Sequence, residues 1–117
     1  MSARWRSGNA ADDGNNTRGW LLGHFIDPAE GVLSTRDVEV KWGVHRAGDE
    51  RATWVCGDER TTLVLLVQGI FRISLTEGSI ALRRQGDYAL WGPGIGHSWE
   101  AVTDSVVVTV RWPSSLS

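Results

Sequence analysis

The residues with the clearest chemical potential lie in one short stretch, GDYALWGPGIGHSW, from Gly86 to Trp99. It holds His97, one of three histidines in the chain, between a Gly/Pro-rich turn and a tryptophan. A histidine with an ordinary pKa exchanges protons near neutral pH, and its neutral imidazole can bind a metal or a polar ligand. We therefore take His97 as the candidate polar anchor or general acid/base of a site, against the alternative of a turn residue without chemistry.

Other side chains suited to a small-molecule site are tryptophans and cations. The chain has seven tryptophans but one tyrosine and two phenylalanines, and tryptophan commonly lines ligand pockets because its indole is apolar and carries one N–H donor. The alternative is structural: Trp42 and Trp112 pack in the core and Trp20 closes one end. In that case only Trp91, Trp99 and Trp54 face a ligand. The predicted ligand-binding residues are Trp42, His45, Arg51, Trp54, Trp91, His97, Trp99 and Arg111.

Short β-type segments carry these side chains. From residue 20 onward, apolar runs alternate with turn residues, and no long stretch has helical periodicity bounded by caps. The sequence predicts an all-β domain of about eight to ten short antiparallel strands, arranged as a sandwich, barrel or jelly roll. The expected strands cover residues 20–26, 37–46, 61–68, 70–75, 79–84, 87–91, 97–102 and 105–112, with residues 47–60 as a polar connection.

The segment of residues 37–46 alternates between two faces. Val38, Val40, Trp42 and Val44 share one face, and Glu39, Lys41, Gly43 and His45 share the other. Because the second face is polar, the alternative to a ligand role for His45 is a histidine on the surface or at the rim of the barrel.

The composition describes one domain. With 117 residues, of which 41% are hydrophobic and 22% charged, the chain suffices for one core and is too short for two. We expect residues 1–19, which are polar and aperiodic, to form a flexible tail, and residues 20–117 to form the domain. The net charge of −2 offers no basic stripe for nucleic acid, and no apolar run suits a membrane span or signal peptide. The single cysteine predicts a reducing, cytoplasmic setting.

The stretch around His97 resembles the second conserved motif of the cupin superfamily. The match consists of Gly86–Asp87, four residues, Gly92–Gly94 with its central proline, two residues and His97. In cupins this motif belongs to a small jelly-roll barrel, and its histidine points inward from the strand after the Pro-Gly turn. The resemblance implies a single-domain cupin-type jelly roll in which His97, Trp99 and Ala101 share the inner face of one strand.

The first cupin motif, which supplies a His-x-His pair and a carboxylate to a metal, is not matched. Gly69 stands where its closing glycine belongs. Counting back, the histidine positions hold Trp54 and Cys56 in one register, or Cys56 and Asp58 in the other. The carboxylate position falls on the threonine pair 61–62.

The resemblance therefore implies a metal site that keeps only His97 of its usual ligands. We expect no cofactor. If a divalent metal does bind, the candidate ligands by residue type are His97, Cys56 and His45, although their spacing matches no known metal signature.

Further matching residues are spread over about residues 20–114, and together they resemble small stand-alone cupins of bacterial, especially actinobacterial, type. This resemblance supplies a fold and no reaction. The matching residues are Trp42-x-x-His45, Ala47-Gly48, Arg51, Trp54, GDYALW, His97-x-Trp99 and Arg111-Trp112-Pro113-Ser114.

These features favour a cytoplasmic small-molecule-binding cupin with a Trp-lined pocket and His97 as polar anchor, independent of metal. The alternative is an isomerase, epimerase, cyclase or lyase of natural-product or sugar metabolism with His97 as general acid/base. A metal-dependent enzyme with atypical ligands is a further alternative. Catalysis needs an acid partner, and none is readable: Glu100 has the opposite parity on its strand, and the loop carboxylates of residues 49, 50, 58 and 59 are candidates only by default.

The expected partners are a small-molecule ligand or substrate and a second copy of the chain, without nucleic acid or membrane. The homodimer is implied by the family resemblance. Strands at the edge of a sheet can pair between subunits, and residues 105–110 or 20–26 are the segments we expect to do so.

Overall fold

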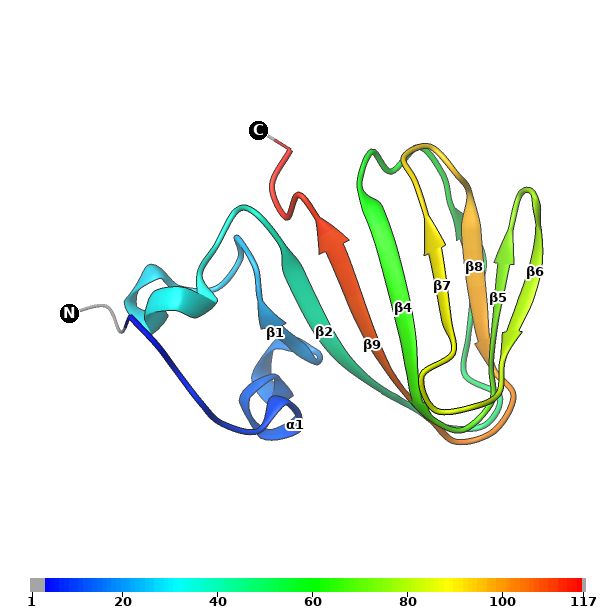
Figure 1. Ribbon diagram of the computed structural model, residues 1–117, viewed down its shortest axis with the longest axis horizontal. Helices are drawn as coiled ribbons and strands as arrows, with labels where there is room; N and C mark the ends of the chain where they lie inside the picture. The colour runs from blue at the N-terminus through cyan, green and yellow to red at the C-terminus, as the bar shows by residue number, and fades with distance from the viewer. Residues whose placement is uncertain (1–3, 117) are drawn as a thin grey trace.

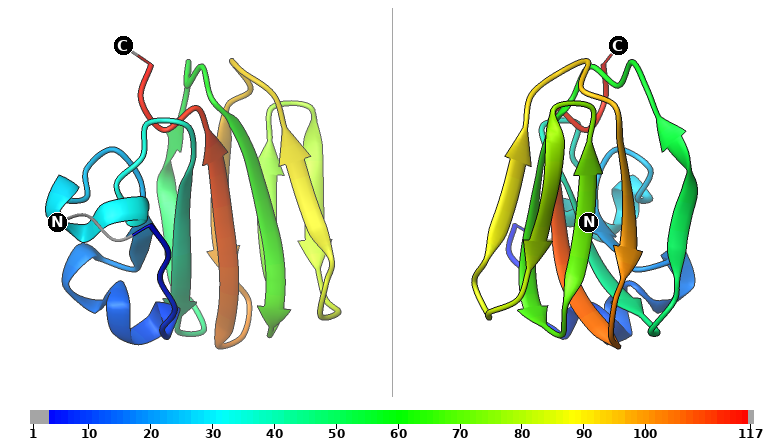
Figure 2. Two further views of the ribbon diagram at one scale, coloured as in Figure 1. Left: turned by 60° about the vertical axis from the view of Figure 1, so that its left-hand side comes forward. Right: turned by 90° about the vertical axis from the view of Figure 1, so that its right-hand side faces the viewer.

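The computed structural model describes residues 4–116, in which two antiparallel β-sheets face each other (Figure 2). The larger sheet has the strand order β1-β2-β9-β4-β7, with β1 Trp20–Leu22, β2 Glu39–His45, β9 Ser105–Trp112, β4 Thr61–Gln68 and β7 Tyr88–Trp91. The smaller sheet has the order β3-β8-β5-β6, with β3 Glu50–Val55, β8 His97–Ala101, β5 Phe71–Leu75 and β6 Gly78–Leu82. The predicted all-β jelly roll is confirmed, with nine strands in the described part of the chain.

Strict alternation along the strands builds the core between the sheets. In β4, Thr62, Val64 and Leu66 are buried, while Leu63 and Leu65 face outward and are half-buried. A period of two is expected of a strand with one face on the core. The buried apolar residues are Val64, Leu66, Phe71, Ile73, Leu82, Ala89, Trp91, Ala101 and Val107.

Glycines with positive φ make the two turns that the motifs predict. Gly69, at φ +94°, turns the chain from β4 into β5, as the expected break at this position requires. Gly86, also at φ +94°, lies in the turn that leads into β7. There the carboxylate of Asp87 accepts the backbone N–H groups of Arg83 and Arg84, each at 2.9 Å, and these bonds lower the pKa of Asp87.

Two expectations about strands were wrong. The polar residues 47–60 contain strand β3, whose side chains are mostly exposed because it lies at a sheet edge and pairs only with β8. Residues 105–110 are not an edge, since β9 is hydrogen-bonded to β2 on one side and β4 on the other. Pairing between subunits through the backbone of β9 is therefore excluded.

Three short helical segments precede β2: α1 Ala10–Asp13, and the 3-10 turns η1 Asn15–Thr17 and η2 Pro28–Leu33. They lie beyond β1 and β2 at one end of the molecule (Figure 1). Asn9 caps α1 by accepting the N–H of Asp12, and the carbonyl of Gly19 accepts the N–H of Trp42 at 2.8 Å. The flexibility of residues 1–19 stays a prediction. No helix among the described residues has the length and apolarity to cross a membrane.

Candidate functional site

A cavity of about 290 Å³ lies inside the barrel, and both sheets contribute to its wall. This volume is at the lower end of the range for small-molecule sites, so it suits one compact ligand. Its apolar and aromatic lining residues are Trp20, Val55, Val64, Phe71, Ile73, Trp91, Trp99 and Val107. Its other lining residues are Arg18, Lys41, Gly43, His45, Arg51, Thr62, His97, Ser98, Thr109 and Arg111.

His97 is the most deeply placed titratable side chain of the wall. It opens β8, is 9% exposed, and packs its ring on that of Trp91 with 4.8 Å between centroids. Its Nδ1 is buried and makes no hydrogen bond within residues 4–116. Burial lowers the pKa of His97, and the backbone of Ile95 opposes this shift only in part. The imidazole is therefore neutral at pH 7, and its Nδ1 is left without a hydrogen-bond partner among the described residues.

The turn before β8 fixes the position of this histidine. The N–H of Gly94 donates to the carbonyl of Asp58 at 2.8 Å, which ties the Pro-Gly turn to the loop that follows β3. Gly94 has φ +84°, a left-handed conformation that glycine adopts readily. The predicted inward direction of His97 thus has a local cause in the residues of the motif.

An aromatic cluster forms a second part of the wall. The ring of Trp99 stacks on Phe71 at 5.2 Å and 24°, and His45 lies 4.4 Å from Trp99 and 5.5 Å from Phe71 between centroids. Burial, followed by the charge of Lys41, lowers the pKa of His45. At neutral pH this part of the wall is aromatic and uncharged.

The polar face of β2 points into the barrel, so His45, the last residue of the strand, lies on its inner face and not on the outer surface. Glu39 is 1% exposed, and Lys41 and His45 line the cavity. Val44, on the other face of the strand, is 66% exposed. The alternation was predicted correctly, but polarity did not identify the inner face because the barrel holds a polar cavity instead of a wholly apolar core.

Of the residues that the structure describes, four cations and no carboxylate line the cavity: Arg18, Lys41, Arg51 and Arg111. They come from the segment after η1 and from strands β2, β3 and β9. Desolvation, then the charges of Arg111, Arg51 and Arg18 in that order, lowers the pKa of Lys41. The cations are thus close enough to repel one another.

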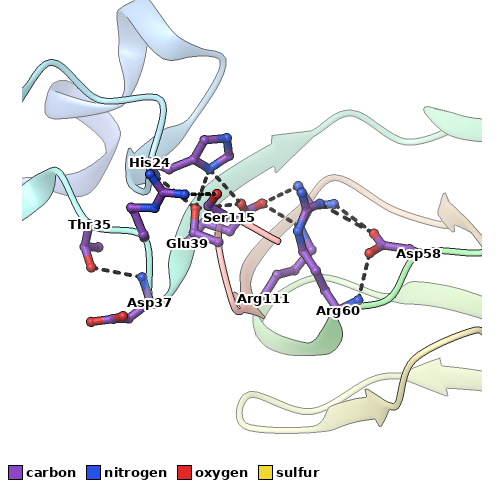
Figure 3. A network of polar contacts seen from close by, with 10 residues as sticks. His24, Thr35, Asp37, Glu39, Asp58, Arg60, Arg111 and Ser115 are labelled. Atoms are coloured by element: carbon purple, nitrogen blue, oxygen red, sulfur yellow. Dashed lines mark hydrogen bonds and ion pairs between the residues drawn. The ribbon is translucent and has the colours of Figure 1, made fainter. Parts of the chain in front are cut away.

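Arg111 is held by carboxylates outside the cavity wall. Its Nε donates to Glu39 Oε2 at 2.8 Å and its Nη2 lies 2.6 Å from the same oxygen, while Nη1 is 4.0 Å from Asp58 (Figure 3). The other oxygen of Glu39 accepts the hydroxyl of Ser114 at 2.9 Å, and that hydroxyl is 2.7 Å from His24 Nδ1. This fully buried Ser114 links the C-terminal segment to β2.

Six of the eight predicted ligand-binding residues line this cavity: His45, Arg51, Trp91, His97, Trp99 and Arg111. Trp42 and Trp54 do not. Trp42 projects from the opposite face of β2 to Lys41 and Gly43, and Trp54 is 43% exposed on the edge strand β3. Their placement corrects the expected lining, because single-sequence reading did not assign the inner face of either strand.

Sequence reasoning missed several wall residues, among them Arg18, Trp20 and Lys41. Lys41 shares its parity with His45, so the alternation of β2 was a usable signal. Trp20 forms part of the wall, beside the cations Lys41 and Arg111. Arg18 precedes the first strand and carried no signal, since we assigned it to the tail.

The donor set does not fit a metal ion. Cys56 is exposed and lies outside the cavity wall, so it does not join His97 and His45 there. No group of three or more His, Cys, Asp or Glu side chains arranged for a metal occurs within residues 4–116. The charged side chains that line the cavity with His97 are all cations, which repel a divalent ion.

No protein-family model matches the sequence, and no curated protein matches it. Solved structures do match. KdgF from Halomonas sp. is 22% identical with a TM-score of 0.62, over 69% of this chain and 74% of that chain. An RmlC-like cupin from Shewanella frigidimarina is 15% identical with a TM-score of 0.61, over 69% of this chain and 70% of that chain.

A salicylate 1,2-dioxygenase variant from Pseudoaminobacter salicylatoxidans is 18% identical with a TM-score of 0.62, over 74% of this chain and 24% of that chain. The chain therefore spans about a quarter of the dioxygenase. At these identities the likeness concerns architecture: the chain has the cupin fold.

Proposed function

We propose that this protein binds a small molecule inside the barrel, with aromatic side chains as walls and His97 as polar anchor. One observation carries the proposal: His97, which is 9% exposed and lines the cavity, has a ring nitrogen without a hydrogen-bond partner among the described residues. A buried polar atom left unpaired destabilises the protein, so a ligand that bonds to it gains affinity. Trp99 and Phe71 offer the flat apolar surface that such a ligand needs.

The proposed binding is independent of metal, because the donor set around His97 lacks further ligands. Elemental analysis after incubation with Fe(II), Zn(II), Ni(II) or Mn(II) tests this. We expect no stoichiometric metal in the wild type. Near-stoichiometric metal that disappears in the His97→Ala variant would overturn it.

Catalysis by His97 stays the alternative, and the lowered pKa of Lys41 is the observation that favours it. Lys41 and His97 are titratable groups on one cavity wall, and a lysine with a depressed pKa can exchange protons closer to neutrality. Catalysis would also need an acid partner for His97. The sequence offered none, and no carboxylate among the described residues lines the cavity. Binding without turnover therefore remains the main proposal.

A fragment screen by ligand-observed NMR tests binding in the barrel. Wild-type protein is compared with Trp99→Leu, which changes the cavity wall, and with Trp54→Leu, which removes an exposed tryptophan on the neighbouring strand. We expect planar fragments to bind the wild type and Trp54→Leu equally, and Trp99→Leu about tenfold more weakly. Fragments that lose affinity with Trp54→Leu, or that bind all three proteins alike, would place the site elsewhere.

We further propose a homodimer in which the outer face of the larger sheet packs on its own copy. The outward positions of β2, β9, β4 and β7 carry no charge, and on this face Tyr88 is 61% and Leu90 53% exposed. In register, Leu63 lies beside Leu90 and Val110, and Leu65 beside Tyr88 and Val108. Monomeric proteins rarely expose apolar patches of several strands, and a second copy offers the same uncharged face.

The proposed location is the cytoplasm. Cys56 is an exposed free thiol, and such thiols persist in a reducing compartment.

A further inference from the structure

We infer that the ligand of this cavity is a small, flat organic anion, held at its charged group by Lys41, Arg51 and Arg18. The inference rests on the proposed function and names the chemical class that the same site takes. It follows from the charges on the wall, from what those charges are paired with, and from where the aromatic rings lie.

The cations of the wall are not balanced. Arg111 is neutralised by Glu39, with two nitrogens at 2.8 and 2.6 Å from one carboxylate oxygen. Lys41, Arg51 and Arg18 have no ion pair and no side-chain hydrogen bond among residues 4–116. Three unpaired cations on one cavity without an acidic lining residue create a positive potential that concentrates anions.

One of these cations is also partly removed from water, while Arg51 and Arg18 are exposed. Lys41 is half-buried on β2, and desolvation lowers its pKa before the neighbouring guanidinium charges lower it further. Its Nζ lies 5.5 Å from the centroid of Trp20, and the Arg111 guanidinium carbon lies 4.6 Å from the same ring. An anion beside Lys41 would supply the counter-charge that this ammonium group lacks, and charge-assisted hydrogen bonds are stronger than neutral ones.

The aromatic side chains of the cavity wall indicate the shape of the uncharged part of the ligand. Trp99 and Phe71 stack in the barrel with only 24° between their planes, and Arg51 is paired with Trp99 in the β3–β8 register. A flat body against these rings therefore places an anionic group beside Arg51. His97, with its unpartnered Nδ1, provides a further polar contact on the same cavity. A carboxylate and a phosphate share this chemistry.

Matched pairs of probes test the charge requirement. Benzoate and benzamide have nearly the same shape and differ in charge, and phenyl phosphate separates a phosphate preference from a carboxylate preference. Binding is followed by tryptophan fluorescence in the wild type, Lys41→Met, Arg51→Met and Arg83→Met. Arg83 is an exposed arginine outside the cavity wall, so its variant controls for the change in net charge.

We expect benzoate or phenyl phosphate to bind at least about tenfold more tightly than benzamide. Lys41→Met and Arg51→Met should each weaken the anion about tenfold and leave benzamide unchanged, while Arg83→Met has no effect. The tighter of the two anions identifies the charged group.

Two results overturn the inference and separate it from the proposed function. If benzamide binds as tightly as the anions, and Trp99→Leu weakens both, the barrel is a binding site but not an anion site. If neither anions nor benzamide bind the wild type, the inference fails together with the proposed site.

Discussion

At the scale of single residues, the ion pair of Glu39 and Arg111 matters both for the stability of the fold and for the cavity wall. Glu39 is buried, and its carboxylate is matched by the guanidinium of Arg111 and the hydroxyl of Ser114. A buried carboxylate is tolerated only when it is paired and hydrogen-bonded. The pair therefore holds β2, β9 and the C-terminal segment together while one partner also forms part of the cavity wall.

Removing one member of this pair should cost much more than removing both. Arg111→Leu leaves the Glu39 charge buried with the Ser114 hydroxyl as donor and the His24 ring 3.9 Å away, and we expect a loss of about 3 kcal/mol in the free energy of unfolding. The double variant Glu39→Leu, Arg111→Leu has no unpaired charge and should recover most of that loss. Urea denaturation of the wild type, Glu39→Leu, Arg111→Leu and the double variant measures this. Additive losses would show that the two side chains are not coupled.

His97 should make stability depend on pH in the weakly acidic range. Its folded pKa lies below the ordinary value of 6.5, so the unfolded chain takes up a proton before the folded chain does. The free energy of unfolding is therefore highest above about pH 6.5 and falls as the pH drops toward the folded pKa.

Denaturation at about pH 7.5 and about pH 5.5 checks this expectation. The decrease should be smaller in His97→Gln than in the wild type. His45 has a lowered pKa for the same cause, so part of the decrease remains in that variant. An equal decrease in both proteins would mean that the pKa of His97 is the same in the folded and the unfolded chain.

At the scale of elements, the motifs predicted where the chain turns better than they predicted which face of a strand points into the barrel. Gly69, Gly86 and Gly94 mark turns because each has a positive φ, which glycine adopts readily whatever packs around it. The local sequence is therefore enough to predict these turns. The side of β2 that faces inward is not local, since it depends on what fills the barrel. The polar strand β3 was missed for a related reason: an edge strand with exposed side chains has no apolar pattern.

Two glycines with the same backbone conformation should respond differently to alanine. Gly69 and Gly48 have φ +94° and +92°, so both substitutions strain the backbone. A Cβ at Gly69 would lie 2.3 Å from the Asp104 carbonyl oxygen and 2.5 Å from Ser105 Oγ. A Cβ at Gly48 would meet no atom within 4 Å. Gly69→Ala should therefore be the more destabilising by at least about 1 kcal/mol.

Thermal denaturation of the two variants and the wild type measures the difference. Equal melting temperatures for Gly69→Ala and Gly48→Ala would show that the turn into β5 relaxes without cost.

At the scale of the whole molecule, the larger sheet separates two different environments. Along β9, Val107, Thr109 and Arg111 face the cavity, while Val106, Val108 and Val110 face outward with no charge beside them. The sequence shows this run of valines plainly, and it suggested an edge strand. Only the strand order reveals that the valines form a face in the middle of a sheet.

A charge placed in the centre of that outer face should separate the proposed dimer. Val108 lies between Trp42 and Leu65 in register, so Val108→Glu would bury a carboxylate against its own copy. Light scattering should give twice the mass of one chain for the wild type and for Ser79→Glu, an exposed position on the smaller sheet, and the mass of one chain for Val108→Glu. A wild type with the mass of one chain would contradict the proposal.

The position of Arg18 has a consequence for proteolysis. This residue follows η1 with φ +56°, is exposed, and yet forms part of the wall that β2 and β9 complete. Trypsin must draw the chain around Arg18 away from that wall to cut after it. A filled cavity should therefore slow cleavage after Arg18 without slowing cleavage after Arg83, so the pattern of early tryptic fragments would report whether the barrel is occupied.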